Sequence, residues 1–448
     1  MDPTLIDAER YPLLTDAGRA TLRRLRQHPQ APRFNYQAGE RLSAEGLVRV
    51  RAFDARLQTD QPQWRPGERP PWVRPFVLRC LEVVPHYRRW ACPADTFLSL
   101  PTVTRDDLAR APWEFVPDGL PLADLITYPT SGATGHPLLV VSHPEASALY
   151  MPLLRRALSV HGVSLEGGPG QVVVALVGFQ RRTYTFTSVC SLLGEAGFVK
   201  LNLHPDDWDH PDDRARYLDD LAPEVYSGDP ITFRELARLP LTARPKALVS
   251  TAMTLLPGLR SELEARFDCP VIDLYSLTEA GPVAVATPRG HEVLSPDLYV
   301  EILRPEGTPC DPGERGEITL TGGRNPFLPL LRYRTGDWAA LDFSGSVPTL
   351  VGLEGRPPTV FRTASGEPIN NIDVTWALRP LPLSRFALHQ AADNSLTLRV
   401  RRDEAPDQAL RQALGELFGP SLPLRILDLP DPPEGKLVQY TRSPEASP

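Results

Sequence analysis

The sequence predicts an α/β protein with a large N-terminal domain, residues 1–352, and a small α+β domain, residues 353–448. Between about residue 127 and residue 276, continuous apolar runs alternate with helical periods, a pattern typical of a buried and largely parallel sheet. Short alternating strands with Gly and Pro turns follow at 298–342. We therefore expect mixed and parallel sheets covered by helices, with a small β-barrel-like part.

The order of elements in the large domain follows from changes in periodicity. Residues 1 to about 120 show helical patterns that prolines interrupt, most densely at 61–75, because proline removes a backbone donor and fixes φ. Beyond them, strands are expected at 137–142, 171–179, 247–251 and 270–276, and helices at 144–162, 187–197 and 257–267. Strands that alternate with helices in this way form a parallel sheet.

The small C-terminal domain has a pattern of its own. Apolar residues at every second position predict a strand at 395–402. A helical period follows at 405–420, with Pro406 near its start and Gly419 at its end, as helix start and stop signals require. A further strand is expected at 424–429.

Composition and charge exclude several classes of protein. The 448 residues carry 48 basic and 55 acidic side chains without a basic stripe, so nucleic acid is not expected as a partner. The strongest apolar run, 172–177, is far shorter than the ~20 residues that cross a bilayer. The chain opens without a signal pattern, and its five cysteines form no CxxC pair. We therefore expect a cytoplasmic protein that has no membrane partner.

A loop rich in hydroxyls and glycines is the first candidate site. Thr130, Ser131 and Thr134 alternate with Gly132 and Gly135. Glycine lets backbone N–H groups approach an anion closely, and the hydroxyls add donors, a combination that suits a triphosphate. The Lys-Ser/Thr of a Walker loop is absent. The same pattern is also typical of an ordinary turn.

Two carboxylates follow apolar segments further along the chain. Glu279 comes just after the strand expected at 270–276, where it can offer one oxygen ligand to Mg²⁺, and Tyr275 beside it can stack on a base. The alternative for this segment is a capped helix start with a core tyrosine. Asp337 follows Gly336, and its carboxylate can accept two hydrogen bonds from a vicinal diol such as that of ribose. A turn aspartate paired with an arginine fits Asp337 as well.

Three further segments complete the candidates. Arg356 stands at the proposed domain boundary, and Lys436 follows a glycine near the C-terminus. A lone lysine near a terminus is also typical of solvated surface. Tyr184 and Phe186 precede the helix expected at 187–197, where plain core aromatics are the alternative.

Together, the order and spacing of these segments resemble the adenylate-forming superfamily of acyl-CoA synthetases, luciferases and peptide-synthetase adenylation domains. The phenylacetate-CoA ligase family is the closer resemblance, in 83–108, in the loop 130–137 and, residue for residue, in 328–335. The similarity covers roughly residues 76–440. It implies a small C-terminal lid on a large domain of packed sheets and helices. It also implies ATP-dependent activation of a carboxylic acid, an aromatic one in the phenylacetate-CoA ligase family, to an acyl-adenylate, followed by transfer to a thiol, that of CoA.

The resemblance implies nucleotide-binding roles for the matched residues. Tyr275 would pack on adenine, Asp337 would bind the ribose hydroxyls, and Arg356 would contact the nucleotide across the gap between the domains. The ATP phosphates would be held by the loop residues Thr130, Ser131, Gly132, Thr134, Gly135 and His136.

The resemblance also implies roles in catalysis and acid binding. Thr278 and Glu279 would serve the α-phosphate and Mg²⁺, with Glu279 as the metal ligand. Lys436 would be a mobile lysine that stabilises charge while the adenylate forms. Tyr184 and Phe186 would line the acyl pocket.

Three departures from the family pattern keep other functions open. Ala133 stands in place of a hydroxyl, His136 in place of a lysine, and Pro358 in place of the hinge aspartate. One alternative is adenylation with a carrier-protein thiol or an amine as the acceptor. Another is a degenerate relative that binds nucleotide with little turnover. The resemblance also allows a homodimer.

Overall fold

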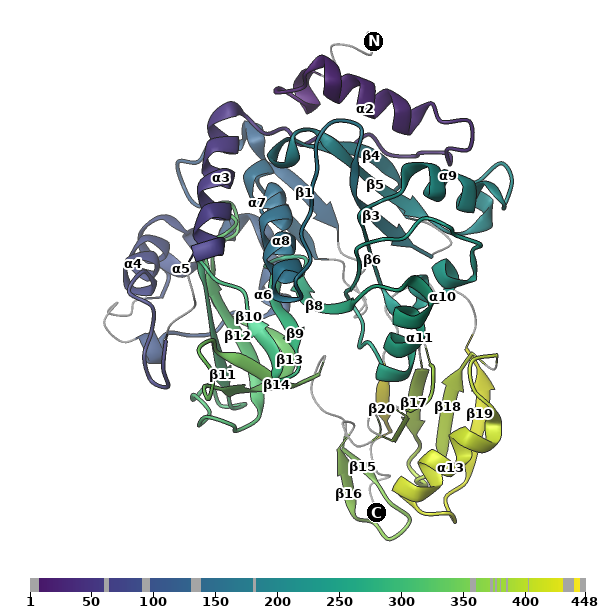
Figure 1. Cartoon of the computed structure of the whole chain (residues 1–448). Coiled ribbons are helices and arrows are strands. Elements are labelled where there is room, and N and C mark those ends of the chain that lie inside the picture. Colours follow the sequence, from purple (N-terminus) through teal and green to yellow (C-terminus); the bar gives the residue numbers. More distant parts are fainter. Residues whose placement is uncertain are drawn as a thin grey trace.

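One twelve-stranded sheet organises the large part of the chain, with the strand order β11-β12-β13-β14-β10-β9-β8-β7-β6-β3-β5-β4. Helices cover it, and a separate four-stranded sheet belongs to the C-terminal part (Figure 1). This confirms the predicted α/β class. The computed structural model describes residues 8–59, 64–90, 97–129, 138–179, 183–354, 360–370, 374, 377–378, 380–383, 386–401, 403–429 and 439–443.

The strands β3, β5, β6, β7 and β8 form the parallel half of the sheet. Their apolar runs are continuous because helices bury both faces. One face packs against α2, α9, α10 and α11, and the other against α3 and α8. The bounds are β3 (Val172–Gly178), β5 (Ala196–Asn202), β6 (Val225–Gly228), β7 (Ala247–Ser250), β8 (Val271–Leu277), α2 (Asp16–Arg26), α3 (Ala44–Thr59), α8 (Tyr150–Val160), α9 (Asp213–Leu221), α10 (Pro230–Arg238) and α11 (Pro257–Phe267).

The edge of the parallel half corrects one prediction. The helix expected at 187–197 is wrong: β4 (Phe186–Cys190) pairs antiparallel with β5, and a short 3₁₀ helix, Ser191–Leu193, follows it. Thr183 to Cys190 are mostly threonine, aromatic and β-branched residues, which suit a pleated and half-buried surface. Pairing with the open edge of β5 therefore outweighs the apolar period that suggested a helix.

The antiparallel half continues the same sheet through the pairing of β8 with β9. The short strands predicted at 298–342 are confirmed, and they extend the sheet instead of forming one of their own. Apolar side chains of these strands pack against the helices of the N-terminal region in one hydrophobic core. The bounds are β9 (Gly281–Thr287), β10 (Gly290–Val293), β11 (Leu298–Leu303), β12 (Gly316–Gly322), β13 (Leu330–Asp342) and β14 (Thr349–Glu354).

The first 120 residues are helical and rich in loops, as predicted. The hairpin of β1 and β2 then leads into the parallel half. The bounds are α4 (Val73–Val83), α5 (Pro85–Arg88), α6 (Arg105–Arg110), β1 (Ile126–Pro129), β2 (Leu139–Ser142) and α7 (Pro144–Ala148), with 3₁₀ helices at Phe97–Ser99, Pro112–Phe115, Leu122–Asp124 and Pro205–Asp207.

The C-terminal part has its own hydrophobic core, which one residue of the large part, Leu256, joins. The predicted strand, helix and strand are all present, and the sheet order is β19-β18-β17-β20. Arg401 donates to Glu235 of α10 over 2.9 Å, so this part contacts α10. The predicted boundary at 352/353 stays a prediction. The bounds are β15 (Val360–Arg362), β16 (Pro368–Asn370), β17 (Phe386–Gln390), β18 (Leu396–Val400), α13 (Asp407–Phe418), β19 (Leu424–Asp428) and β20 (Tyr440–Arg442).

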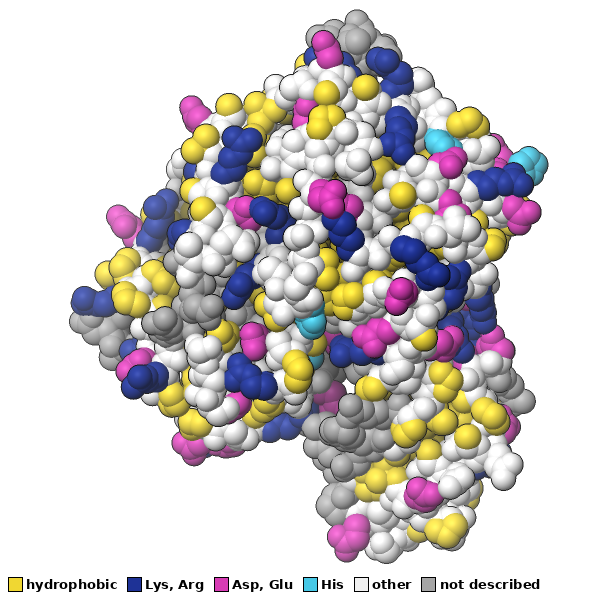
Figure 2. Space-filling view, in the orientation of Figure 1, with side chains coloured by type: hydrophobic (Ala, Val, Ile, Leu, Met, Phe, Trp, Pro, Cys, Tyr) yellow, Lys and Arg dark blue, Asp and Glu magenta, His cyan; other side chains and the backbone are white. Residues whose placement is uncertain are grey.

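The surface mixes charges of both signs. Figure 2 shows basic and acidic side chains interspersed on the face drawn, with apolar side chains between them. Within the part of the chain that the structure describes, no helix has the length and apolar character needed to cross a membrane.

Candidate active site

A tyrosine and a carboxylate from two distant segments meet where the two halves of the sheet join. The Tyr275 hydroxyl, on β8, donates to Oδ2 of Asp337, on β13, over 2.8 Å. Asp337 is 8% exposed, and its backbone N–H donates to Thr335 Oγ1 over 3.1 Å. Burial first, and then the Asp337 carboxylate, raise the pKa of Tyr275 well above its usual value. Tyr275 therefore stays a donor that holds Asp337 in place.

A second tyrosine holds the other predicted carboxylate. Glu279 lies in the turn between β8 and β9, is 6% exposed, and accepts a short hydrogen bond from the hydroxyl of Tyr333 on β13. Burial, followed by the charge of Glu279, raises the pKa of Tyr333 well above its usual value. Thr278, next in the turn, is exposed. The structure thus brings Tyr275, Glu279 and Asp337 to the β8–β13 junction.

Tyr333 is a site residue that the sequence reasoning missed. Tyr333 belongs to the segment 328–335 that carries the family resemblance and precedes Asp337 by four residues, and this proximity was the signal. Two-residue alternation could not have shown the shared site, because a register shift interrupts β13 between Arg334 and Trp338.

The arginines beside Asp337 bind other carboxylates. Arg334 pairs with Glu317 on β12 over 2.5 Å, and Glu317 also accepts from the backbone N–H of Gly336 over 3.0 Å. The buried Arg332 pairs with Glu301 over 2.7 Å. These pairs fix the backbone of β13 on both sides of Tyr333.

Several predicted residues lie outside the described part of the chain. β1 ends at Pro129 and β2 begins at Leu139, so the pair frames the predicted phosphate loop without showing it. The residues concerned are Thr130, Ser131, Gly132, Ala133, Thr134, Gly135, His136, Arg356, Pro358 and Lys436.

Tyr184 and Phe186 are described, and the structure places them away from the β8–β13 junction. Phe186 is on β4, five strands from β8 in the sheet order, or roughly 24 Å at about 4.8 Å per strand. Tyr184 is 58% exposed. The ring centroid of Tyr36 is 5.4 Å from that of Tyr184 and 6.0 Å from that of Phe186.

The β8–β13 junction offers one carboxylate oxygen as a ligand for Mg²⁺. Oε1 of Glu279 accepts from Tyr333, whereas Oε2 accepts no hydrogen bond from the described residues. Mg²⁺ in nucleotide sites takes one or two carboxylates and completes its shell with phosphate and water. Among the described residues, no group of three or more His, Cys, Asp or Glu side chains is arranged to hold a metal ion. A single carboxylate next to bound phosphates is therefore the arrangement that these residues support.

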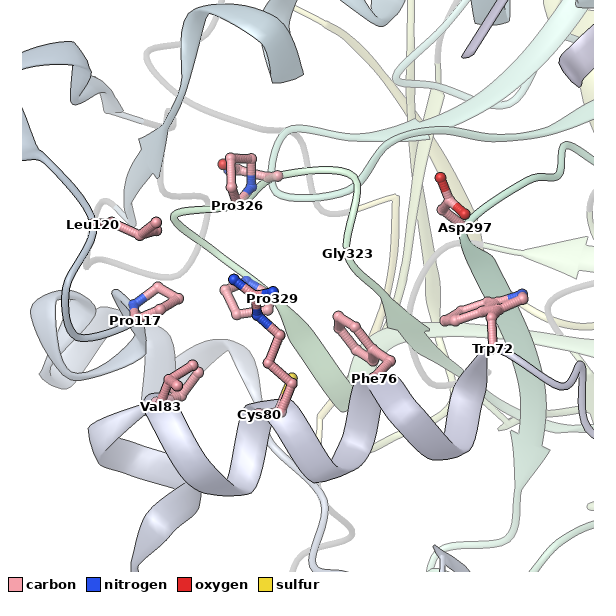
Figure 3. A pocket seen from close by; sticks show the side chains of 13 residues that line it. Trp72, Phe76, Cys80, Val83, Pro117, Leu120, Asp297, Gly323, Pro326 and Pro329 are labelled. Carbon is pink, nitrogen blue, oxygen red and sulfur yellow. The ribbon is translucent and has the colours of Figure 1, made fainter. Parts of the chain in front are cut away.

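A cavity of about 290 Å³ lies elsewhere, between α4 and the loop that leads into β13. Figure 3 shows Phe76 and Val83 of α4 on one side and Pro326 and Pro329 on the other. None of the predicted site residues lines this cavity, so it is separate from the β8–β13 junction.

Comparison with known proteins relates the part of the chain that includes β8 to a protein family. Residues 113–325 match the family model described as AMP-binding enzyme. The predicted resemblance to adenylate-forming enzymes is confirmed. This AMP-binding region includes Tyr275, Thr278 and Glu279, while β13 lies beyond it.

Two curated relatives match parts of the chain. The phenylacetate-coenzyme A ligase of Escherichia coli (strain K12) is 36% identical over 90 residues, which cover 19% of this chain and 21% of that protein. Protein CapK of Staphylococcus aureus is 24% identical over 254 residues, 54% of each chain. The chain thus spans about a fifth and about half of their lengths.

A solved structure shares the fold over most of the chain. 2-Hydroxyisobutyryl-CoA ligase in the postadenylation state, in complex with 2-HIB-AMP, has a TM-score of 0.61 and 17% identity, with 90% of each chain covered. The predicted fold, a large mixed sheet with a small α+β C-terminal part, is confirmed.

Proposed function

We propose that this protein activates a carboxylic acid with ATP to an acyl-adenylate and then transfers the acyl group to the thiol of CoA. The observation that carries the proposal is the β8–β13 junction. There, two buried carboxylates are each held by a tyrosine, and the AMP-binding match covers one of them, Glu279. The matches to CoA ligases support the same reaction class.

The described residues have distinct parts in this proposal. Asp337, oriented by Tyr275, accepts hydrogen bonds from the ribose hydroxyls. Glu279, oriented by Tyr333, offers Oε2 to Mg²⁺, which when bound neutralises phosphate charge. Thr278 donates to the α-phosphate. Charge neutralisation and positioning are what phosphoryl chemistry asks of a protein.

The residues outside the described part complete the proposed site. Lys436 and Arg356 supply positive charge during adenylate formation. The phosphates rest on Thr130, Ser131, Gly132, Thr134, Gly135 and His136.

The proposed reaction has two balanced steps. A carboxylate oxygen of the acid attacks the α-phosphorus of ATP, the bond to the β-phosphate oxygen breaks, and pyrophosphate leaves. The CoA sulfur then attacks the acyl carbonyl, loses its proton, and AMP leaves with the carbon–oxygen bond electrons.

The deciding experiment is ATP–pyrophosphate exchange with a panel of carboxylic acids, with and without CoA. Exchange that depends on an acid, together with thioester formation that depends on CoA, is the expected result. Exchange without a CoA product would favour a carrier-protein thiol or an amine as acceptor. No exchange with any acid, while ATP still binds, would favour the degenerate relative to which Ala133, His136 and Pro358 point.

Two accompanying predictions concern the setting of the enzyme. We propose a cytoplasmic location and a homodimer. Light scattering coupled to size-exclusion chromatography measures the second directly, and a monomer at micromolar concentration would contradict it.

A further inference from the structure

Lys200 has a half-buried ammonium group without a partner among the described residues. It lies on β5, and its pKa is lowered by burial. No carboxylate, hydroxyl or carbonyl of the described residues bonds it. Lysine is almost never buried unless it is paired, because removing the charge from water is costly. An anion supplied by a ligand would offset that cost.

Aromatic side chains surround this lysine. Phe186 on β4 is its cross-strand neighbour, and Phe198 precedes it by two residues on the same face of β5. The rings of Phe186 and Phe198 are stacked at 17°, with centroids 6.4 Å apart. Tyr150 at the start of α8 lies 6.5 Å beyond Phe198. We call these three rings with Tyr36 and Tyr184 the aromatic face.

The exposed rim of the aromatic face is held in place by backbone contacts. Tyr36 is 50% exposed and Tyr184 is 58% exposed. The Asn35 side chain bridges two backbone groups of the segment just before β4, since its Nδ2 donates to Thr183 O and its Oδ1 accepts from Thr185 N, each over 2.9 Å. Exposed aromatic rings that pack on each other offer apolar contact area to a ligand.

A row of paired strand residues links Lys200 to β8. Lys200 stands two residues from the carboxyl end of β5 and is in register with Leu176 of β3 and Ser227 of β6, and the row continues to Ile272 of β8, three residues before Tyr275. The Tyr150 hydroxyl donates to Ser227 over 3.3 Å, so α8 covers this row. Ligands of open α/β sheets bind outside the carboxyl ends of the strands.

The distance between Lys200 and the β8–β13 junction sets the length of the ligand. β5 is four strands from β8, or roughly 19 Å at about 4.8 Å per strand, which leaves about 10–15 Å once the reach of the lysine side chain is subtracted. An acid whose carboxylate is at the junction would need a long body to reach Lys200.

We propose that Lys200 and the aromatic face form the distal end of the acid-binding site, and that the preferred acid has a long apolar or aromatic body with a second anionic group at its far end. This inference rests on the proposed function for the reacting carboxylate. The second anion pairs with Lys200 in a charge-assisted hydrogen bond, and the body packs on Phe186 and Phe198.

The test compares matched acids on the full-length protein. The probes are decanedioate against decanoate, and a biphenyl dicarboxylate against the matching biphenyl monocarboxylate. Calorimetry measures binding, and ATP–pyrophosphate exchange measures kcat/KM. We expect the wild type to prefer each diacid by about 10- to 100-fold, Lys200→Met to lose the preference, and Lys200→Arg to keep most of it.

The two readouts separate the inference from the proposed function. Equal handling of both members of each pair by the wild type, or an unchanged ratio in Lys200→Met, overturns the role of Lys200. If no acid supports exchange, the proposed function fails. Diacid binding that Lys200→Met abolishes would then still support the site, and absent binding would overturn it. Tyr184→Ser is expected to weaken both members of each pair alike, and ATP affinity should not change in any of these variants.

Discussion

The β8–β13 junction and the β4–β5 edge both shield charged side chains from water. They differ in whether neighbouring side chains give these charged groups a hydrogen-bond partner. At the junction, Glu279 and Asp337 each accept a hydrogen bond from a tyrosine. At the β4–β5 edge, Lys200 has no such partner among the described residues, and burial dominates its pKa.

The difference separates two kinds of ligand contact. A side chain that binds the same part of a ligand in every turnover benefits from being fixed in its binding conformation before the ligand arrives, because the entropy of ordering it is then lost on folding and not on binding. A group that meets the variable part of a substrate gains specificity from staying unsatisfied until the right ligand arrives. The junction is therefore suited to the nucleotide, and the β4–β5 edge to the acid.

Among the changes at the junction, removing the Glu279 charge should cause the largest loss of acid-dependent exchange. Glu279→Gln keeps the size and an acceptor for Tyr333, but it loses the charge proposed to hold Mg²⁺. We expect acid-dependent exchange to fall by roughly 10²–10³-fold, as when one preorganised electrostatic group is lost. Glu306→Gln, at an exposed carboxylate, is the control and should leave exchange unchanged. Equal rates in the two variants would exclude Glu279 from the site.

Asp337→Ala should act on nucleotide affinity. A charge-assisted hydrogen bond is worth roughly 1.5–3 kcal/mol, so we expect ATP binding to weaken by about one to two decades in calorimetry. The variant also leaves Tyr275 without its acceptor, so Tyr275→Phe is the matched control, with a smaller loss. Full ATP affinity in Asp337→Ala would remove this carboxylate from ribose recognition.

Tyr333→Phe tests whether orientation of Glu279 matters beyond its presence. The variant deletes one hydroxyl from a fully buried ring. We expect kcat for exchange to fall about fivefold, while KM for ATP changes little, since a net hydrogen bond contributes about 1 kcal/mol. A fall in thermal stability with unchanged kcat would show that the hydroxyl only supports the fold.

The last prediction concerns the stability of the fold and not catalysis, and it depends on the pH at Glu40, beside the β4–β5 edge. Glu40 accepts from the backbone N–H of Ser191 over 2.9 Å, and burial raises its pKa from 4.5 to about 7. Between about pH 4.5 and pH 7 the unfolded chain loses this proton before the folded chain does. Folding stability should therefore fall as pH rises through this window, by at most about 1.4 kcal/mol per pH unit.

The measurement for Glu40 is the difference in denaturant midpoint between wild type and Glu40→Gln at a series of pH values. The wild type should lose stability relative to the variant as the pH rises. A difference that stays constant across the window would show that Glu40 titrates alike in the folded and unfolded chains.

The local pattern of the chain was enough to predict its class, about half of its strands and several of its helices, and to single out Glu279 and Asp337 as candidate site carboxylates. Continuous apolar runs in β3 and the alternation in β18 report burial on two faces or one, and burial is a local property of side chains. The turn that carries Glu279 and the glycine before Asp337 are likewise local signals.

Tertiary structure decided what depends on pairing between distant segments. β4 is a strand because β5 offers it an edge, although its apolar period suggests a helix. The match of Tyr333 to Glu279 joins residues 54 positions apart, and the isolation of Lys200 depends on three neighbouring strands and α8. No local pattern contains these contacts, because register and strand order, rather than residue type, determine which side chains meet.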